Sequence, residues 1–403
     1  MPKTYTKPYY IFFLMLPTGI SNGFVSVVLP FLLTKNGFPV SITAGIVALG
    51  LSANLWRFLW GPVVDMSLSL RKWFWIGLFS STALLLLLCF TPFTIKGTVL
   101  LSVIVFLSQV AATFILLPIN GFMAQRIEDN KKGKASGWYQ AGSLTGTGLG
   151  GGAGLWLATH FSVAVSGIIL CAASLLVGLV ILLIQDIHHE SGKKILDEVR
   201  VMGKDIFAMI KIPAALLVMI LITMPIGTGS MSNLWSAIAQ DWKAGENTVV
   251  LVTGLLSGGI SALGCVAGGF ISDRWGVWVA YLGTGMICAL VTFIMAVMPG
   301  QPIVYITGVL AYAFSMGMIY AAFTAIILYA IGKKHVATKF SLLASLGNLP
   351  VVYMTAFDGW THDKYNSRYM LMAEALAGFL FVVIFFLILR RMMQKKMIPA
   401  IIE

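Results

Sequence analysis

Charged residues are scarce in this sequence. They make up 10% of the 403 residues, while apolar residues make up 58%; a soluble globular domain carries roughly 25% charged residues. The shortage excludes a protein that exposes most of its surface to water. Such a chain must satisfy its backbone polar groups internally, so it crosses a membrane either as helices or as a closed barrel.

Cysteine and histidine are also scarce, at four and five residues. Cys89, Cys171, Cys265 and Cys288 each lie within a long apolar run without a metal-ligand spacing, so we interpret them as small core residues. The histidines fall in loops or at the ends of apolar runs and form no cluster. We therefore expect no metal, no cofactor and no enzymatic activity, because an intramembrane enzyme needs converging His, Asp or Glu side chains.

Apolar runs of about 20 residues or more are abundant, and this is the length at which a helix crosses the hydrocarbon. Barrel strands would be shorter and would alternate with a period of two. The pattern predicts an all-α integral membrane protein with twelve transmembrane helices, at residues 8–33, 40–64, 72–92, 98–125, 135–159, 161–185, 213–238, 247–271, 277–298, 303–331, 336–358 and 369–390.

Basic residues indicate the orientation of these spans. Of the 27 lysines and arginines, 21 fall in the two termini and the loops on their side, and five fall in the opposite loops. Cytoplasmic loops carry the excess of basic residues, so both termini are expected in the cytoplasm. The same distribution explains the net charge of +12 as membrane topology, and we expect no nucleic-acid partner.

The longest polar stretch, residues 186–211, divides the chain near its middle. Its apolar residues, including Ile195, Leu196 and Val199, are spaced as in an amphipathic helix. We predict an N-terminal six-helix bundle at residues 1–185, a cytoplasmic linker lying on the membrane surface at 186–211, and a C-terminal six-helix bundle at 212–403.

The two halves carry matching motifs. Gly61 and Asp65, in the pattern G-x-x-x-D, follow the second predicted span, and Gly269 and Asp273 follow the eighth. The offset of 208 residues is about half the chain. Such an internal repeat is typical of membrane transporters built from two parallel six-helix repeats.

With these features the chain resembles the major facilitator superfamily, whose members carry G-x-x-x-D-R-x-G-R-R-like loops after the second and eighth helices. The second copy here matches through Gly276, although Val277 and Trp278 replace the basic pair. The resemblance implies two pseudo-symmetric six-helix bundles, and it implies that this loop is a cytoplasmic gate and stabiliser. The gating residues are then Gly61, Asp65, Arg71, Gly269, Asp273 and Arg274.

Within the superfamily, a stretch around the fourth and fifth spans resembles the muropeptide permeases, acetyl-CoA transporters and some siderophore permeases. It contains Ile119-Asn120-Gly121-Phe122-Met123, then Gly137-Trp138-Tyr139-Gln140-Ala141-Gly142. Members of that branch carry an aspartate where Asn120 stands, so the resemblance does not extend to proton coupling at this position. It implies uptake across a bacterial inner membrane.

Arg57 lies within the second predicted span, eight residues before Asp65. An arginine at membrane depth costs roughly 2.5–3.5 kcal/mol on insertion scales, so it should face a cavity or a partner. Its planar guanidinium suits a carboxylate or phosphate, which predicts a clamp for an anionic substrate, shared with Asn54 one turn away. The structural alternatives are a pair with Asp65 or a helix C-terminus, or a side chain that reaches the headgroups.

Amide and tryptophan side chains within other spans are further candidates for substrate contact. Gln109 and Asn120, eleven residues apart, share one face of the fourth span. Each amide has an equally physical alternative role, which is to hold helices together. The complete set of these candidates is Asn22, Gln109, Asn120, Gln140, Trp138, Asn233, Trp235 and Asn348.

Asp358 and Glu374 are the carboxylates nearest to membrane depth in the second half. Either can carry a coupling proton if it is buried, and either can instead anchor a helix end at the membrane interface.

In the first half, Gly142, Gly146 and Gly150 begin a stripe with a spacing of four residues on the fifth span, which predicts close helix packing. The same run resembles the G-P-x-x-G-G signature of drug/proton antiporters, with Thr147 in place of the proline.

We therefore expect a secondary active transporter that takes up a small organic solute, anionic or polar and conjugated, such as a muropeptide, acyl-CoA or siderophore. Two bundles would rock around a central site near mid-membrane. The expected partners are this substrate, the lipid bilayer and a coupling proton, and the protein is expected to be a monomer. The alternatives are a proton-coupled drug or metabolite efflux antiporter, a non-transporting receptor and an intramembrane enzyme.

Overall fold

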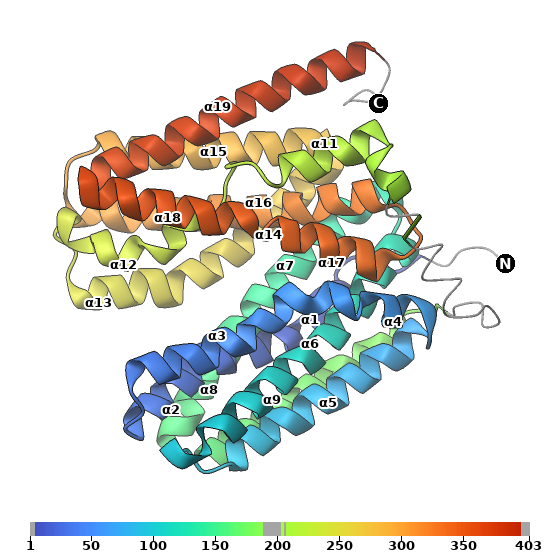
Figure 1. The fold of residues 1–403 in the computed structure, drawn as a ribbon, viewed down its shortest axis with the longest axis vertical. Helices are drawn as coiled ribbons and strands as arrows, with labels where there is room; N and C mark the ends of the chain where they lie inside the picture. The colour runs from blue at the N-terminus through green and yellow to red at the C-terminus, as the bar shows by residue number, and fades with distance from the viewer. Residues whose placement is uncertain (1–4, 188–202, 205–206, 396–403) are drawn as a thin grey trace. The chain divides into compact units, whose positions relative to one another are not determined.

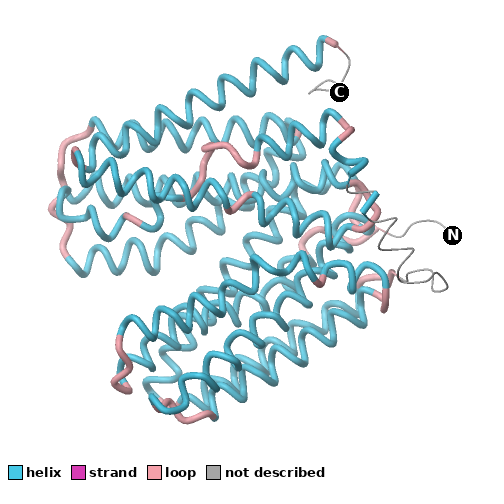
Figure 2. Tube along the Cα trace, viewed as in Figure 1, coloured by secondary structure: helices cyan, strands magenta, loops and turns pink. Residues whose placement is uncertain are grey.

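The computed structural model describes residues 5–187, 203–204 and 207–395, and these residues form helices and connecting loops without strands (Figures 1 and 2). The prediction of an all-α membrane protein is confirmed. Most of the predicted linker, including Ile195, Leu196 and Val199, lies outside the described residues.

The predicted spans of the first half correspond to helices that several short 3-10 or π turns interrupt. These helices are α1 (Tyr10–Gly23), α2 (Leu29–Lys35), α3 (Val40–Trp56), α4 (Gly61–Met66), α5 (Leu70–Phe90), α6 (Thr98–Arg126), α7 (Lys132–Gly148), α8 (Gly154–His160) and α9 (Val163–Gly178). Those of the second half are α11 (Pro213–Leu221), α12 (Trp235–Ile238), α13 (Glu246–Val249), α14 (Ser257–Trp275), α15 (Val277–Val297), α16 (Pro302–Ile331), α17 (Val336–Leu346), α18 (Leu349–Lys364) and α19 (Ser367–Gln394).

Nine helical stretches among the described residues are long and apolar enough to cross a membrane. They coincide with all predicted spans except the second, fifth and seventh. The second is interrupted by a 3-10 turn at Arg57–Leu59, and the fifth contains the glycine-rich π turn Leu149–Ala153. Glycine adds little apolar character, which explains why the fifth stretch is less apolar than the others.

The prediction of one continuous helix at residues 213–238 is wrong. Regular helix ends at Leu221, and a 3-10 turn begins only at Ser230. Pro225 has no N–H to donate, and Gly227 and Gly229 have φ angles of +56° and +82°. Only glycine adopts such angles readily, so these three residues together break the helix in mid-span.

The chain forms two compact units. Unit 1 comprises Met1–Glu128, Gly142–Met202 and Lys333–Ser341, and unit 2 comprises Asp129–Ala141, Gly203–Gly332 and Leu342–Glu403. Helices α7 and α17 therefore each contribute one part to unit 1 and another part to unit 2. The predicted domain boundaries at residues 185 and 212 remain a prediction, because most of the segment between them lies outside the described residues.

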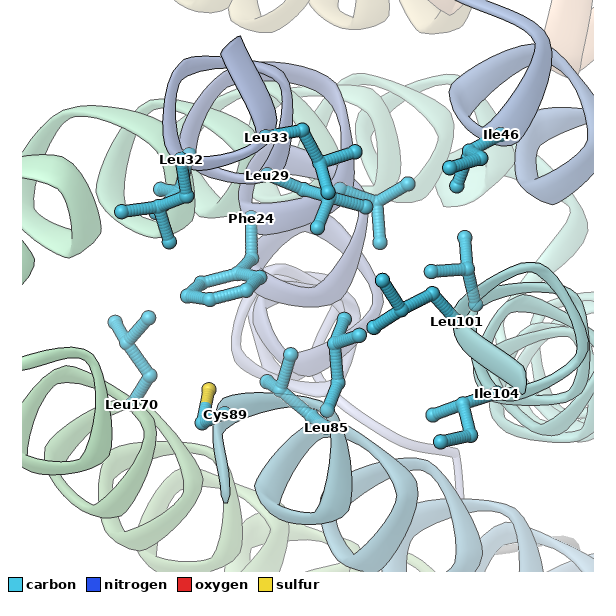
Figure 3. Close-up of a cluster of buried hydrophobic side chains, with 14 of the residues drawn as sticks. Phe24, Leu29, Leu32, Leu33, Ile46, Leu85, Cys89, Leu101, Ile104 and Leu170 are labelled. Atoms are coloured by element: carbon cyan, nitrogen blue, oxygen red, sulfur yellow. The ribbon is translucent and has the colours of Figure 1, made fainter. Parts of the chain in front are cut away.

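Unit 1 has a core of apolar side chains around Phe24, which is fully buried (Figure 3). Leu29 and Leu33 of α2, Leu85 of α5 and Leu170 of α9 surround it. Lipid tails are as apolar as leucine, so at membrane depth such a cluster is stabilised mainly by close packing between helices. Cys89 and Cys171 belong to the same cluster, as expected of small core residues.

The glycine stripe of the fifth span packs against α1 within unit 1. A Cβ atom on Gly146 would lie 2.9 Å from the Cα atom of Gly19. A Cβ atom on Gly150 would meet the backbone carbonyl group of Ile20. The predicted close packing is thus confirmed, and it depends on side-chain-free positions on both helices.

Replacing Gly150 by valine is therefore expected to separate these helices. The new side chain would meet backbone atoms of Ile20, which cannot rotate away, and overpacking of this kind costs about 1–3 kcal/mol. We expect Gly150→Val to lower the midpoint of thermal unfolding in detergent. Gly148→Val is the matched control, because a Cβ atom there meets nothing within 4 Å. Equal destabilisation by the two variants would contradict this account.

Candidate functional site

Unit 1 contains buried amide groups with unused hydrogen-bonding capacity. Gln109 of α6 donates from Nε2 to Ser21 Oγ of α1 at 3.0 Å, while its Oε1 atom has no partner among the described residues. Asn120, also on α6, is fully buried, and neither polar atom of its amide has a partner there. Oδ1 of Asn22 is likewise a buried atom without a hydrogen-bond partner among the described residues. Unpaired buried polar groups cost about 1–3 kcal/mol each, so these amides favour a polar ligand.

The turn that contains Arg57 lies against this face of α6. Trp60, the residue after the turn, donates from Nε1 to Thr113 Oγ1 at 2.8 Å. Thr113 is four residues after Gln109 and seven before Asn120, so the three share one helix face. Arg57 is half-buried at the start of the turn, and Asn54 is half-buried one turn earlier on α3. An arginine, several amides and hydroxyls therefore lie on adjoining elements of unit 1.

The predicted contacts that fall in unit 2 are more dispersed. Gln140 donates to Thr324 Oγ1 of α16 at 2.8 Å, and Asn233 donates to Thr355 Oγ1 of α18 at 3.1 Å, so both hold helices together. Trp138 is half-buried on α7. Asn348 is exposed between α17 and α18.

Trp235 is the exception, because it is buried and lies beside a second polar cluster. Its ring packs edge-on against Tyr312 of α16, with ring centroids 5.2 Å apart, and its carbonyl oxygen accepts a hydrogen bond from Tyr305. Tyr312 in turn donates to Glu374 Oε1 at 3.4 Å. Sequence reasoning identified Trp235 and Glu374 separately and missed Tyr312, which joins them.

Asp358 and Glu374 are both buried within unit 2. Asp358 of α18 is 0% exposed and Glu374 of α19 is 9% exposed, so both carboxyl groups are buried inside the protein. They are close enough to interact electrostatically. Ser230, at the end of the helix break, donates to Glu374 Oε1 at 3.1 Å. Sequence reasoning missed Ser230 too, although Pro225, Gly227 and Gly229 just before it signal the break.

The first G-x-x-x-D motif caps a helix. Asp65 accepts three hydrogen bonds at the start of α17: from the N–H of Ala337 at 3.1 Å, and from the N–H and hydroxyl of Thr338, both at 2.9 Å. Burial raises the pKa of the Asp65 carboxyl, and these hydrogen bonds oppose that rise. A Cβ atom on Gly61 would lie 2.9 Å from the Cα atom of Thr338, so glycine one turn earlier permits this approach.

The second copy of the motif repeats this geometry within unit 2. Asp273 accepts hydrogen bonds from the N–H groups of Gly133 at 2.6 Å and Lys134 at 3.0 Å, at the start of α7. A Cβ atom on Gly269 would lie 3.0 Å from the Cα atom of Gly137. A carboxylate at a helix N-terminus satisfies free N–H groups and interacts favourably with the helix dipole.

The two basic residues predicted to accompany these motifs, Arg71 and Arg274, have different surroundings from each other. Arg71, at the start of α5, donates to the carbonyl oxygen of Ile184, and its backbone N–H donates to Asp186 Oδ1 at 3.0 Å. It therefore ties the third predicted span to the end of the sixth. Arg274 is exposed at the end of α14.

Removing the Asp65 carboxylate is expected to destabilise the start of α17. Asp65→Ala removes three hydrogen bonds, and loss of an N-terminal cap costs about 1–2 kcal/mol. Asp65→Asn replaces one of the two accepting oxygens by an NH2 group, so it keeps only the hydrogen bonds of the other oxygen. It also loses the charge at the helix N-terminus, which contributes about 0.3–1 kcal/mol. Thermal unfolding in detergent should rank wild type above Asp65→Asn and Asp65→Ala last. The exposed Asp363 supplies the control, since Asp363→Ala should match wild type. An unchanged Asp65→Ala protein would refute the capping role.

Comparison with known proteins gives one matching family and several solved structures with a similar fold. The family model described as Major Facilitator Superfamily matches residues 11–355. No curated protein sequence matches the chain significantly.

Three solved structures are similar over nearly the whole chain. The E. coli fucose:proton symporter FucP has a TM-score of 0.70 at 14% identity, covering 94% of this chain and 98% of that one. The proton:xylose symporter XylE has a TM-score of 0.68 at 12% identity, covering 94% and 95%. A bacterial homologue of the iron transporter ferroportin has a TM-score of 0.65 at 12% identity, covering 94% and 98%. At these identities the likeness concerns the fold alone.

Proposed function

The chain belongs to the major facilitator superfamily, and on that premise we propose that it is a secondary active transporter for a small organic solute. The solute is anionic, or polar and conjugated, and is taken up across a bacterial inner membrane by alternating access. The fold shared with two proton-coupled sugar symporters supports secondary transport. A muropeptide, an acyl-CoA or a siderophore has the chemistry that the sequence resemblance implies.

The observation that carries the substrate class is the polar face of unit 1. Gln109 and Asn120 retain unpaired amide atoms although both are buried, and the turn bearing Arg57 packs against the same helix. Amides recognise hydroxyl, amide and carboxyl groups, and a guanidinium recognises carboxylate or phosphate in two-pronged geometry. A solute that carries both kinds of group suits this combination.

Alternating access needs helices that rearrange without exposing backbone polar groups to lipid. The carboxylates of Asp65 and Asp273 accept hydrogen bonds from N–H groups at the starts of α17 and α7. These hydrogen bonds would stabilise one conformation of the transporter until they break. Both caps belong to loops that the distribution of basic residues assigns to the cytoplasm. We assign the coupling ion to the buried carboxylates of unit 2, Asp358 and Glu374, with a proton as the ion that the sequence predicts.

The anionic class can be tested by ligand-induced stabilisation of wild type and Arg57→Ala. A ligand that binds only the folded state stabilises it by RT ln(1 + [L]/Kd), which is about 2.7 kcal/mol at one hundred times Kd. The panel contains muropeptides, acyl-CoA and CoA, ferric carboxylate siderophores, sugar phosphates and cationic drugs. We expect an anionic member to raise the unfolding temperature of wild type, and we expect Arg57→Ala to bind it roughly 10- to 100-fold more weakly, because a charged hydrogen bond contributes about 1.5–3 kcal/mol.

The matched control is Arg368→Ala, which removes the same charge from an exposed position at the start of α19. It should respond to the ligand like wild type. If Arg57→Ala also responds like wild type, Arg57 is structural and the anion assignment is lost. If only cationic drugs stabilise the protein, a drug efflux antiporter replaces the proposal.

A further inference from the structure

The break in the seventh predicted span releases backbone acceptors inside unit 2. Between the end of α11 and Ser230, no backbone N–H of the described residues donates to the carbonyl groups of Pro225, Ile226 or Gly227. Gly378 lies one turn after Glu374 on α19, and a Cβ atom there would be 3.9 Å from the carbonyl oxygen of Pro225. The carbonyl oxygen of Pro225 therefore lies close to the helix that carries Glu374.

The two buried carboxyl groups add further acceptors without donors. The Ser230 hydroxyl lies close to both groups but has one proton, which it donates to Glu374 Oε1. Oε2 of Glu374 and both carboxyl oxygens of Asp358 have no hydrogen-bond partner in the described part of the chain. When both carboxyl groups are ionised, these three unpaired oxygens are all acceptors.

In the part of the chain that the structure describes, no basic side chain is seen to interact with this pair of carboxyl groups. The titratable groups that interact with the pair, among the residues described, are Tyr312 of α16 and Cys288 of α15. Both are neutral, and Tyr312 donates its proton to the oxygen of Glu374 that already has Ser230 as a partner. Two like charges close together in an apolar surrounding repel, so a bound cation would stabilise the pair.

A small cavity lies beside Glu374. It is lined by Pro225, Gly227, Thr228, Cys288 and Thr292, among others, and has room for about one water molecule. It is too small for an organic solute. Its lining includes Glu374, Thr228 and two residues of the broken segment, Pro225 and Gly227. These residues carry carboxylate, hydroxyl and carbonyl oxygens, which are the ligands that hard cations prefer.

We propose that the Glu374–Asp358 pair and the helix break form a binding site for one sodium ion. The carboxylates of Glu374 and Asp358, the hydroxyls of Thr228 and Ser230 and the released carbonyl groups would supply the ligands. Unwound backbone at a broken transmembrane helix is a known means of coordinating sodium in transporters. A transition metal is disfavoured, because no group of three His, Cys, Asp or Glu side chains comes together in the described residues.

A multi-coordinate cation fits the site better than a proton does. A proton on one carboxyl oxygen converts that atom into a donor and leaves the other acceptors unpaired. A sodium ion contacts several oxygens at once and suits a cavity of the size of one water molecule. In the transport cycle, which rests on the proposed function, sodium would then be the coupling ion instead of a proton alone; sodium binding itself does not depend on that function.

The test is thermal unfolding of the full-length protein in detergent, in sodium, potassium or choline chloride at constant ionic strength and pH. We expect a saturable rise of the unfolding temperature in sodium chloride alone. Glu374→Gln and Asp358→Asn should abolish this rise. Ser230→Ala and Thr228→Val should weaken the apparent sodium affinity at least several-fold. These two variants keep the test decisive if a carboxylate variant fails to fold. Asp363→Asn, at an exposed position, should keep the full rise.

Equal unfolding temperatures in the three salts would overturn the sodium site. Stabilisation that follows pH and ignores the choice of cation would overturn it in favour of a proton. Either result leaves the solute-binding proposal standing if the anionic ligand still stabilises wild type in choline chloride. Loss of ligand stabilisation with an intact sodium response would instead remove the proposed substrate class and keep the ion site.

Discussion

Inside a bilayer, every backbone N–H and C=O group must find its partner within the protein, and the rest of this structure depends on that constraint. It explains why the described residues form helices and connecting loops without strands. It also makes each departure from regular helix informative, because a freed polar group in lipid costs several kcal/mol unless something satisfies it. The interruption at Arg57–Leu59 and the break after Leu221 are such departures, and each lies beside a cluster of buried polar side chains.

The same constraint accounts for the duplicated motif. A helix N-terminus leaves N–H groups unpaired, and Asp65 and Asp273 satisfy them at α17 and α7. The glycine four residues earlier in each copy lets the capped helix approach the capping helix. Helices that meet without hydrogen bonds between them depend on close packing of their surfaces. The glycine stripe that packs on α1 is an example. Polar caps can release and re-form, whereas packed glycine faces can slide, and a transporter that alternates between two conformations needs both.

Sequence reasoning predicted the helical class, the tight glycine packing and the burial of the cysteines, because periodicity and hydropathy determine these features locally. It failed at residues 213–238, because the positive φ angles of Gly227 and Gly229 follow only from the fold. It likewise could not pair Glu374 with Ser230 and Tyr312, which are 144 and 62 residues away in sequence. Hydrophobic patterns determine which segments are buried, but they do not determine which polar side chains meet inside the bundle.

The most direct test of transport is solute flux in proteoliposomes. The purified protein is reconstituted with an anionic ligand that stabilises it, and labelled ligand is followed against a gradient of sodium or of protons. The account predicts uptake that requires the protein, exceeds equilibrium transiently when the coupling gradient is imposed, and fails in the Arg57→Ala variant. Tight binding of the ligand with no flux under any gradient would contradict it, and would make the protein a receptor built on a transporter fold.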